Sequence, residues 1–392
     1  MIKVCHLTSV HNAKDGRIFK KQCCSLAKAG YDVYLIAPAA HSEDINGVKI
    51  VGVPGVKKGR LYRMFCLTKA VYRKALEINA DIYQIHDPEL ILYAAKLKKK
   101  GKIVVYDSHE DFPQQIKSKN YIPGLLRNIL FYSYSYLEKK ILRKMDAVIS
   151  VSPNIVERLS RINPNTYQIT NYPIVKEVYD PVQREDRVIC FTGQISRLWM
   201  HENILSAINT LPDVRYVLAG PANEEYLEKL KKHEEWKRVD YRGEVKSEKV
   251  REILQHSKIG IALYDYSAEL GYNIGTLGNT KLFEYMQAGL PIVCTDFILW
   301  KQVVKNGGCG ICVNPRNINE ISRAIIYLLE HQDQAREMGK KGQELVQERY
   351  NWKTQEKVQA GRDYSFVYLN PVYDVNYTGI YQKMMDYPIN KV

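Results

Sequence analysis

The sequence predicts an α/β protein with two doubly wound, Rossmann-like domains in series. Three observations support this fold class. Short apolar runs suited to buried parallel strands alternate with amphipathic helical segments along most of the chain. Apolar periodicity is lost once, over residues 174–186, and the same alternation then restarts. At 392 residues, the chain is also too long for one ordinary hydrophobic core.

The first predicted domain spans residues 1–173. Apolar runs predict strands at residues 2–10, 31–37, 48–53, 82–85, 103–106 and 147–151, and residues 167–172 close the domain. Helical spacing of apolar residues predicts helices at residues 18–29, 61–78, 88–99, 122–144 and 154–159. This alternation predicts a parallel sheet that is covered by helices on both faces.

The second predicted domain spans residues 187–349 and follows a linker at residues 174–186. Its strands are predicted at residues 188–192, 214–219, 259–264, 292–294 and 310–313, with helices between them. Residues 350–360 are expected to form one more helix, and residues 361–392 are a tail of unknown role. Because ligands of doubly wound sheets bind at the carboxyl ends of the strands, the two domains are expected to face a central cleft.

The composition narrows the classes of partner. Hydrophobic residues make up 45% and charged residues 26% of the chain, which is typical of soluble globular proteins. A net charge of +14 favours phosphate-rich partners such as nucleotides, nucleic acid or an anionic membrane surface. No segment resembles a nucleic-acid-binding module, so no nucleic acid partner is expected.

The sequence also predicts a location. The first ten residues follow a strand pattern and not that of a signal peptide, and no segment approaches the roughly 20 apolar residues of a membrane-spanning helix. The eight cysteines lack metal-type spacing and are expected to be reduced, buried thiols. We therefore expect a cytoplasmic protein whose only contact with a membrane is peripheral.

The segment from Gly275 to Asp296 combines a loop, a helix, a turn and a strand. Asn279 and Thr280 carry side-chain oxygens that are expected to accept hydrogen bonds from the first free N–H groups of the helix. Lys281 adds a positive charge there, and the carboxylate of Glu284 lies one turn further along. A phosphate at the helix start with a diol one turn away describes a ribose diphosphate. A capped, buried helix without any ligand is the alternative interpretation.

Within this segment, KLFEYMQAGLPIV resembles the donor-binding segment of retaining glycosyltransferases of the GT-B fold, most of all glycosyltransferase family four (glycosyl transferases group 1). The resemblance extends to about residue 359, and residues 350–360 resemble the helix that crosses back to the first domain in that family. It implies that Glu284 holds the ribose of a nucleotide diphosphate sugar. The donor-binding residues that it implies are Glu284, Lys281, Thr280, Asn279, Gly278, Thr276, Arg197 and Gly193.

The chain departs from the family pattern at two places in the second domain. In FTGQISRLWMHEN, Gln194 and Trp199 occupy the usual basic positions, and Arg197 is the nearest candidate ligand for phosphate. Thr276 stands where many members have a glutamate that contacts the donor sugar. In YRGEV, Arg242 and Val245 are candidates for contact with the base. These departures leave open a catalytically silent relative that binds a nucleotide sugar or a partner enzyme as a scaffold.

Three polar segments follow strands of the first domain, namely TSVHNAKDGR, HDPE and DSHED. The reactive groups of open parallel sheets lie just past the strand ends. The resemblance implies that His109 lies beside the donor sugar, and His109 is the catalytic candidate. Asp87 and Glu89 are candidates for binding acceptor hydroxyls, and Arg17 for binding phosphate or acceptor. Each histidine taken alone is more often a satisfied structural group.

The resemblance implies a metal-independent hexosyl transfer. The sequence has no DxD segment, no zinc spacing and no Walker loop, and no cofactor is expected beyond the donor substrate. Backbone amides, Lys281 and Arg197 would stabilise the departing diphosphate. The acceptor hydroxyl would attack the face that the nucleotide leaves, and the leaving phosphate would take the proton. A GT-B nucleotide-sugar epimerase is a further alternative.

Two stretches that combine basic and apolar residues bear on whether the protein meets its acceptor at a membrane surface. Between Gly55 and Lys74 there are seven basic residues and no acid: Lys57, Lys58, Arg60, Arg63, Lys69, Arg73 and Lys74. Residues 121–144 are strongly apolar and end in basic residues. Either both segments are core helices with a solvated basic edge, or they contact anionic lipid. The second interpretation predicts a glycan or lipid-linked saccharide acceptor at the inner face of the cell membrane, in cell-surface polysaccharide synthesis.

Overall fold

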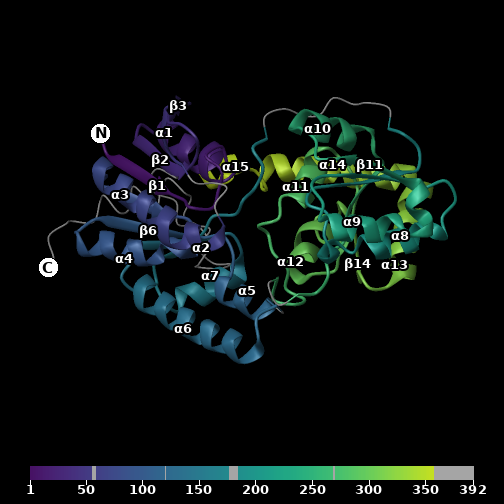
Figure 1. Ribbon diagram of the computed structural model, residues 1–392. Helices are drawn as coiled ribbons and strands as arrows, with labels where there is room; N and C mark the ends of the chain where they lie inside the picture. Colours follow the sequence, from purple (N-terminus) through teal and green to yellow (C-terminus); the bar gives the residue numbers. More distant parts are fainter. Residues whose placement is uncertain (55–58, 120, 176–183, 268–269, 357–392) are drawn as a thin grey trace. The chain divides into compact units, whose positions relative to one another are not determined.

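The computed structural model describes residues 1–54, 59–119, 121–175, 184–267 and 270–356 (Figure 1). The chain divides into two compact units. The first contains residues 1–171 and, within the described ranges, residues 353–356; the second contains Tyr172–Trp352. Most of the predicted linker, the end of the predicted helix at residues 350–360, and the tail at residues 361–392 lie outside the described residues.

The first unit is built on an eight-stranded sheet with the order β3-β4-β2-β1-β5-β6-β7-β8. Its strands are β1 Lys3–Leu7, β2 Asp32–Pro38, β3 Glu43–Ile45, β4 Val48–Val53, β5 Ile82–Ile85, β6 Ile103–Ser108, β7 Ala147–Ser150 and β8 Thr166–Gln168. All neighbours are parallel except β3 and β4, which form an edge hairpin through Asn46 and Gly47, both with positive φ. The sequence did not predict β3 because this short strand has no apolar run.

Two helical segments of the first unit, η1 and η2, are π-helical stretches inside helices that the sequence predicted. All helical segments of this unit are η1 Ile18–Cys23, α1 Cys24–Lys28, α2 Arg60–Tyr62, η2 Arg63–Leu67, α3 Thr68–Ile78, η3 Pro88–Leu90, α4 Ile91–Lys99, α5 Phe112–Ser118, α6 Gly124–Leu142, α7 Pro153–Ser160 and α15 Trp352–Glu356. Helix α5 was not predicted; it begins where the Asp111 carboxylate accepts a hydrogen bond from the backbone N–H of Gln114. Every residue of β5 and β7 is buried, so the sheet is covered on both faces.

The second unit has a six-stranded, fully parallel sheet with the order β11-β10-β9-β12-β13-β14. The strands are β9 Val188–Thr192, β10 Arg215–Ala219, β11 Val239–Gly243, β12 Ile259–Ala262, β13 Ile292–Thr295 and β14 Gly310–Val313. Its helical segments are η4 Arg197–Trp199, α8 His201–Asn209, α9 Glu224–Lys231, η5 Glu234–Arg238, α10 Ser247–His256, α11 Lys281–Gln287, α12 Ile298–Trp300, η7 Lys301–Lys305, α13 Ile318–Glu330 and α14 Gln332–Glu348.

The strand order reverses at one strand in each sheet. In the first unit β1 pairs with β2 on one side and β5 on the other, and in the second unit β9 lies between β10 and β12. Ligands of open α/β sheets bind beyond the carboxyl ends of the strands at such a switch point. The topology therefore directs attention to the loops after β1 and β5, and to those after β9 and β12.

The structure bears on two sequence predictions, one about the burial of the cysteines and one about membrane-spanning helices. All eight cysteines are free thiols, but Cys66 is exposed and Cys312 is half-buried, so the prediction that they are all buried is wrong for these two residues. Cys66 lies in η2, whose outer face is open to solvent. Among the helices within the described ranges, none is both long and apolar enough to span a bilayer.

Candidate active site

A pocket of about 690 Å³ lies at the carboxyl ends of β1, β5 and β6 in the first unit. The loops after these three strands line it, together with η2 and α5. The lining side chains include Ser9, His11, Arg63, Leu67, His86, Asp87, Glu89, His109, Phe112 and Gln115. Several residues predicted from the sequence, namely His109, Asp87 and Glu89, therefore share one pocket. The pocket lies at the switch point of this sheet, beyond the carboxyl ends of β1 and β5.

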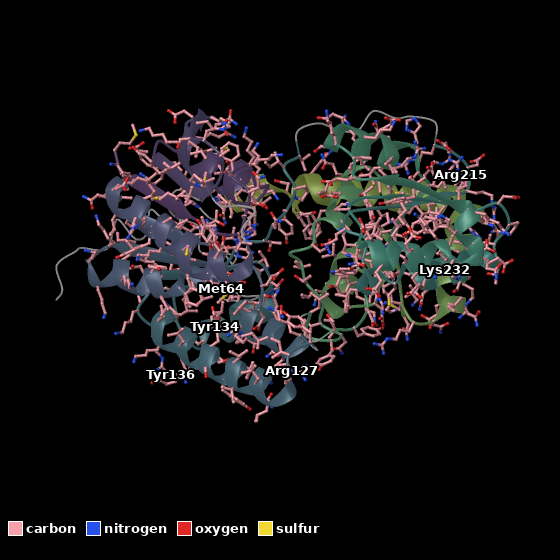
Figure 2. All side chains as sticks on the ribbon, in the orientation of Figure 1. Met64, Arg127, Tyr134, Tyr136, Arg215 and Lys232 are labelled. Atoms are coloured by element: carbon pink, nitrogen blue, oxygen red, sulfur yellow. The ribbon has the colours of Figure 1, made fainter. Side chains whose placement is uncertain are left out.

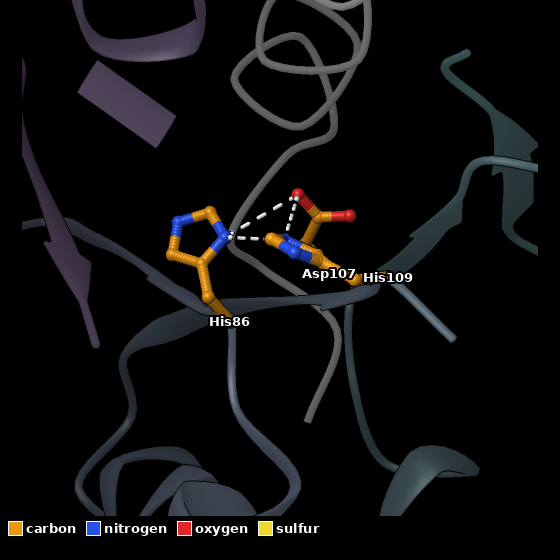
Figure 3. Close-up of side chains that lie close together, drawn as sticks. All are labelled: His86, Asp107 and His109. Carbon is orange, nitrogen blue, oxygen red and sulfur yellow. Dashed lines mark hydrogen bonds and ion pairs between the residues drawn. The ribbon is translucent and has the colours of Figure 1, made fainter. Parts of the chain in front are cut away.

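Imidazole rings converge on one carboxylate at the inner wall of this pocket (Figure 3). His86 Nδ1 and His109 Nε2 lie 3.3 Å apart, and each lies 3.3 Å from Asp107 Oδ2. On its other side, His86 Nε2 lies 2.9 Å from His6 Nδ1. His86 and Asp107 are fully buried, whereas His109 is 18% exposed. His109 is thus the member of this cluster that solvent reaches.

Arg17 holds Asp107 in its ionised form. Arg17 NH2 donates to Asp107 Oδ1 at 2.9 Å, and the Arg17 Nε donates to Oδ2 at 3.2 Å. Burial opposes ionisation, but the charges of Arg17 and His109 outweigh it and hold the pKa of Asp107 well below its usual value. Arg17 NH1 donates to the carbonyl of Ile169. Arg17 is therefore buried, and its donors are already engaged with Asp107 and Ile169, so it is not a solvated surface residue.

Asp87 and Glu89 line the pocket but already have partners. Asp87 Oδ2 accepts hydrogen bonds from the Thr8 hydroxyl at 2.9 Å and from backbone N–H groups of the loop after β1. His11 Nε2 lies 3.5 Å from the other oxygen of Asp87. Glu89 forms a two-pronged ion pair with Arg63, whose NH2 donates at 2.9 Å. Both carboxylates therefore shape the pocket wall.

The loop before α11 in the second unit is held by its own side chains. Asn279 Oδ1 accepts a hydrogen bond from the backbone N–H of Lys281 at 3.1 Å, as predicted. The prediction for Thr280 is wrong, because its hydroxyl donates to Glu284 Oε1 at 2.7 Å and caps no backbone N–H. The Thr280 hydroxyl bonds to the Glu284 carboxylate because a hydrogen bond to an ionised acceptor is stronger than one between a neutral hydroxyl and a backbone N–H. Thr276 Oγ1 accepts from the backbone N–H of Gly278 at 3.0 Å.

Lys281 is the unusual cation of this unit. Its Nζ lies 4.4 Å from the ring centroid of Trp199 and 5.1 Å from that of Phe191. No hydrogen bond or ion pair joins Nζ to any residue within the described ranges. Burial lowers the pKa of Lys281, while the charge of Glu284 opposes this shift. A desolvated ammonium held only by aromatic faces favours an anionic ligand.

Gly193 makes room for this ammonium. It follows β9 with φ near +140°, where its N–H donates to the carbonyl of Ala219. A Cβ atom at this position would lie 2.4 Å from Lys281 Nζ. Gly193 and Lys281 therefore share one site at the switch point of the second sheet.

Two family models match most of the chain. The model described as Glycosyltransferase Family 4 matches residues 17–170, and the model described as Glycosyl transferases group 1 matches residues 180–345. The chain belongs to these glycosyltransferase families. It therefore transfers a sugar from a donor.

Known proteins and structures agree with this assignment. An uncharacterised glycosyltransferase of Methanocaldococcus jannaschii is 24% identical over 82% of this chain and 87% of its own length. Sucrose-phosphate synthase of Thermosynechococcus elongatus is 16% identical, with a TM-score of 0.73 over 90% of this chain and 96% of its own. Anabaena HepE in complex with UDP and glucose is 14% identical, with a TM-score of 0.66 over 90% and 97% of the chains. The glycosyltransferase thus has the GT-B fold.

The remaining predicted site residues of the glycosyltransferase lie on its surface or in its core. Arg197 is 65% exposed and forms a 3.6 Å ion pair with Glu225. Trp199 is buried and packs edge-on against Phe191. Arg242 pairs with Asp240 at 2.6 Å on the surface. Val245 is half-buried against the core. None of these contacts by itself indicates a ligand.

Three residues of the glycosyltransferase site were not selected from the sequence. His11, His86 and Asp107 all lie in the polar segments that follow strands, so the signal was present. Their convergence depends on the pairing of β1 with β5 and of β5 with β6, which the sequence does not specify. His86, Asp107 and His109 also form the group within the described ranges whose atoms could together hold a metal ion.

Proposed function

We propose that this glycosyltransferase moves a hexose from a nucleotide diphosphate sugar to a glycan or lipid-linked saccharide, with retention of anomeric configuration. The half-buried Lys281, whose ammonium has no ion-pair partner among the described residues, is the observation that carries the proposal. A diphosphate would supply the missing negative charge. The structural similarity to HepE, which was solved with UDP and glucose, supports this class of donor.

The second unit would bind the donor through α11 and the preceding loop. Lys281 binds the diphosphate, and Glu284 accepts hydrogen bonds from the two ribose hydroxyls. A carboxylate has about four lone-pair sites, so the hydrogen bond from Thr280 leaves sites for the diol. Thr276 would contact the sugar by its hydroxyl in place of the usual carboxylate.

The first unit would bind the acceptor in its pocket, with His109 at the solvent-reached end of the histidine cluster. The acceptor hydroxyl attacks the anomeric carbon on the face from which the nucleotide departs. The bond from this carbon to phosphate oxygen breaks, the new glycosidic bond forms, and the phosphate takes the hydroxyl proton. Lys281 offsets the charge that develops on the diphosphate, so the transfer requires no metal.

We further propose that the acceptor is lipid-linked and is reached from a membrane surface. Leu125, Ile129, Tyr132 and Tyr136 follow one another at helical spacing on α6 and are between 53% and 78% exposed. We call these four residues the α6 stripe; Figure 2 shows Tyr136 on the outer side of the helix. The core interpretation of residues 121–144 is therefore wrong for the α6 stripe. Helix α5, which packs on α6, also lines the acceptor pocket.

The charge around the α6 stripe favours anionic lipid. The only acid in residues 121–144 is Glu138, which is buried and paired with Arg158 at 2.6 Å. Exposed basic residues continue the helix at Lys139, Lys140 and Arg143. Each basic side chain near an anionic bilayer contributes about 1 kcal/mol. Leu61 and Phe65 are also exposed, whereas Lys57, Lys58 and the Arg60 side chain lie outside the description.

The donor proposal is tested by thermal unfolding with a panel of uridine, guanosine and adenosine diphosphate sugars. A donor at about 100 times its Kd should add roughly 2.7 kcal/mol of stability. One base should raise the Tm of the parent chain, and Glu284→Ala should lose that shift. A folded parent chain that responds to no donor would contradict the proposal.

The membrane proposal is tested by flotation with liposomes. At low salt, the parent chain should float with anionic vesicles and not with neutral ones. The double variant Leu125→Gln, Ile129→Gln should float less, whereas Leu92→Gln on α4 is the matched control because Leu92 is also exposed. Equal recovery of all three proteins would contradict the α6 stripe as the contact surface.

A catalytically silent scaffold is the second candidate function. It is favoured by Thr276, whose hydroxyl accepts a backbone hydrogen bond where the family has a sugar-binding glutamate. Donor binding without turnover across a broad set of acceptors would support it. Release of the nucleotide only when an acceptor is present would support glycosyl transfer instead.

A further inference from the structure

We propose that His86, Asp107 and His109 form a binding site for a divalent transition metal ion of the zinc type, and that an ion bound there blocks the acceptor pocket. Metal binding itself does not depend on the proposed function. The blocking of transfer does rest on it, because it assigns the pocket to the acceptor and His109 to the reaction. Figure 3 shows the three side chains facing one another.

The spacing of the three ligand atoms fits a zinc-sized ion. His86 Nδ1, His109 Nε2 and Asp107 Oδ2 form a triangle with three sides of 3.3 Å. The centre of such a triangle lies about 1.9 Å from each corner, so an ion with bonds of about 2.0–2.1 Å lies just off its plane. Tetrahedral ligands at these bond lengths are themselves roughly 3.3–3.4 Å apart. Only a small rearrangement is therefore needed.

The second layer of contacts orients each of these ligands. His86 Nε2 lies 2.9 Å from His6 Nδ1, which can accept the proton that a metal-bound imidazole keeps on its other nitrogen. Arg17 NH2 donates to Asp107 Oδ1 at 2.9 Å, and Gln22 Nε2 donates to Oδ2 at 2.7 Å. Neutral imidazole and ionised carboxylate are the forms that metals bind.

Hydrogen bonding alone satisfies this cluster poorly. Asp107 Oδ2 is the acceptor that lies within reach of both ring nitrogens, and Gln22, the Nε of Arg17 and, at 3.4 Å, Gln84 Nε2 already donate to it. Two further N–H donors from His86 and His109 would bring five donors to one oxygen atom. A cation bound by the lone pairs of both rings replaces these two donors with one partner, which reduces the crowding.

The fourth coordination position would open into the pocket. His86 and Asp107 are fully buried, so the ion reaches solvent on the side of His109, which lines the pocket. Two imidazoles, one carboxylate and an open position suit zinc, nickel or iron(II). A bound ion would engage His109 Nε2 and place a water molecule where acceptor hydroxyls bind. We therefore expect zinc to inhibit transfer.

The proposal is tested by metal binding to the full chain, after chelator treatment and its removal. Equilibrium dialysis with zinc chloride alone should show a site in the parent chain that His86→Ala and His109→Ala weaken at least about tenfold. His256→Ala is the matched control, because His256 is half-buried, lies in the second unit and bonds within its own helix. Cobalt(II) at this site should give the visible absorption bands of four-coordinate geometry. Circular dichroism establishes that each variant is folded.

Equal zinc affinity in the parent and both ligand variants would overturn the proposal. Transfer by the parent chain should fall when zinc is added and return when a chelator is added. A parent chain that binds zinc at this site and transfers sugar undiminished would overturn the blocking role. A chain that shows no transfer at all would refute the proposed function, and the zinc affinities would then decide the metal site alone.

Discussion

The two units differ in whether a key charged side chain, Asp107 in the first and Lys281 in the second, has partners among the described residues. In the first unit, Asp107 lies between Arg17, Gln22 and the two histidines. In the second unit, Lys281 has aromatic rings around it and no hydrogen-bond or ion-pair partner among the described residues. A charge with partners is fixed before any ligand arrives, whereas a buried charge without one gains most when a ligand supplies the partner. The arrangement around Asp107 fixes the positions of the side chains near it, whereas the arrangement around Lys281 favours the binding of an anionic ligand.

The largest effect is expected from Asp107→Ala, which removes the partner of Arg17. The guanidinium would remain buried without its counter-ion, at a cost of about 3–5 kcal/mol to the stability of the first unit. Urea unfolding monitored by circular dichroism measures this cost. Asp240→Ala is the control, because its pair with Arg242 is exposed to solvent and worth about 0–1 kcal/mol. The comparison fails if both variants unfold at the parent's midpoint.

Lys281→Met should have the reverse profile. Removal of a half-buried charge that has no ion-pair partner among the described residues should leave the stability of the second unit unchanged or raise it. Loss of about 1.5–3 kcal/mol of charged contact should weaken donor binding roughly 10- to 100-fold. Calorimetric titration with the donor found in the panel measures the affinity. A destabilised variant that binds the donor normally would reverse the roles given to the two charges.

His201 makes the second unit sensitive to acid. Burial, assisted by the charge of Lys281, lowers the pKa of His201 to about 3 from the ordinary value of 6.5. Between these values the unfolded chain binds a proton that the folded chain refuses, so stability is lost as the pH falls below 6.5. At pH 5, this group should reduce the stability of the second unit by about 2 kcal/mol relative to pH 7.5.

The measurement for His201 is urea unfolding at a series of pH values. His201→Gln keeps a polar partner for the Tyr216 hydroxyl, which lies 2.9 Å from His201 Nδ1, and removes the titration. Its stability should therefore vary less between pH 7.5 and 5. An identical pH slope in the variant would show that other groups cause the acid sensitivity.

The smallest effect is expected from Arg197→Ala. Arg197 is 65% exposed, and its ion pair with Glu225 is long at 3.6 Å. We expect a change in stability within about 0.5 kcal/mol and a loss of donor affinity of about threefold, in contrast to Lys281. The same calorimetric titration applies. A loss as large as that of Lys281→Met would mean that both cations share the diphosphate.

Strand positions could be predicted from the sequence because buried parallel strands are apolar runs. Strands β4, β5, β9 and β14 lie where the apolar runs predicted them. The edge strands β3 and β11 and helix α5 were missed. A hairpin turn defines β3 and an Asp111 cap defines α5, while β11 has no fully buried residue, so none of the three has apolar periodicity. Local signals thus gave the sheet interiors, and the elements that depend on turns and caps were lost.

The candidate site could be predicted only in part. Lys281 and Glu284 stand out locally, since they lie one turn apart on a helix that follows a glycine-containing loop. Arg17 could not be assigned, because its partner Asp107 is 90 residues away in the chain. The histidine cluster needed the strand order to bring three loops together. Side-chain roles that depend on long-range partners require the fold.

The hydrogen bond between Gln355 and Thr170 has a consequence for synthesis of the chain. Gln355 Oε1 accepts from the backbone N–H of Thr170 at 2.9 Å, across 185 residues of sequence. The second unit is thus inserted between two segments of the first. A ribosome adding about 5–20 residues per second needs roughly 10–40 s to make this insertion. The unit begun first is therefore completed last, and until then the nascent first unit lacks its closing helix.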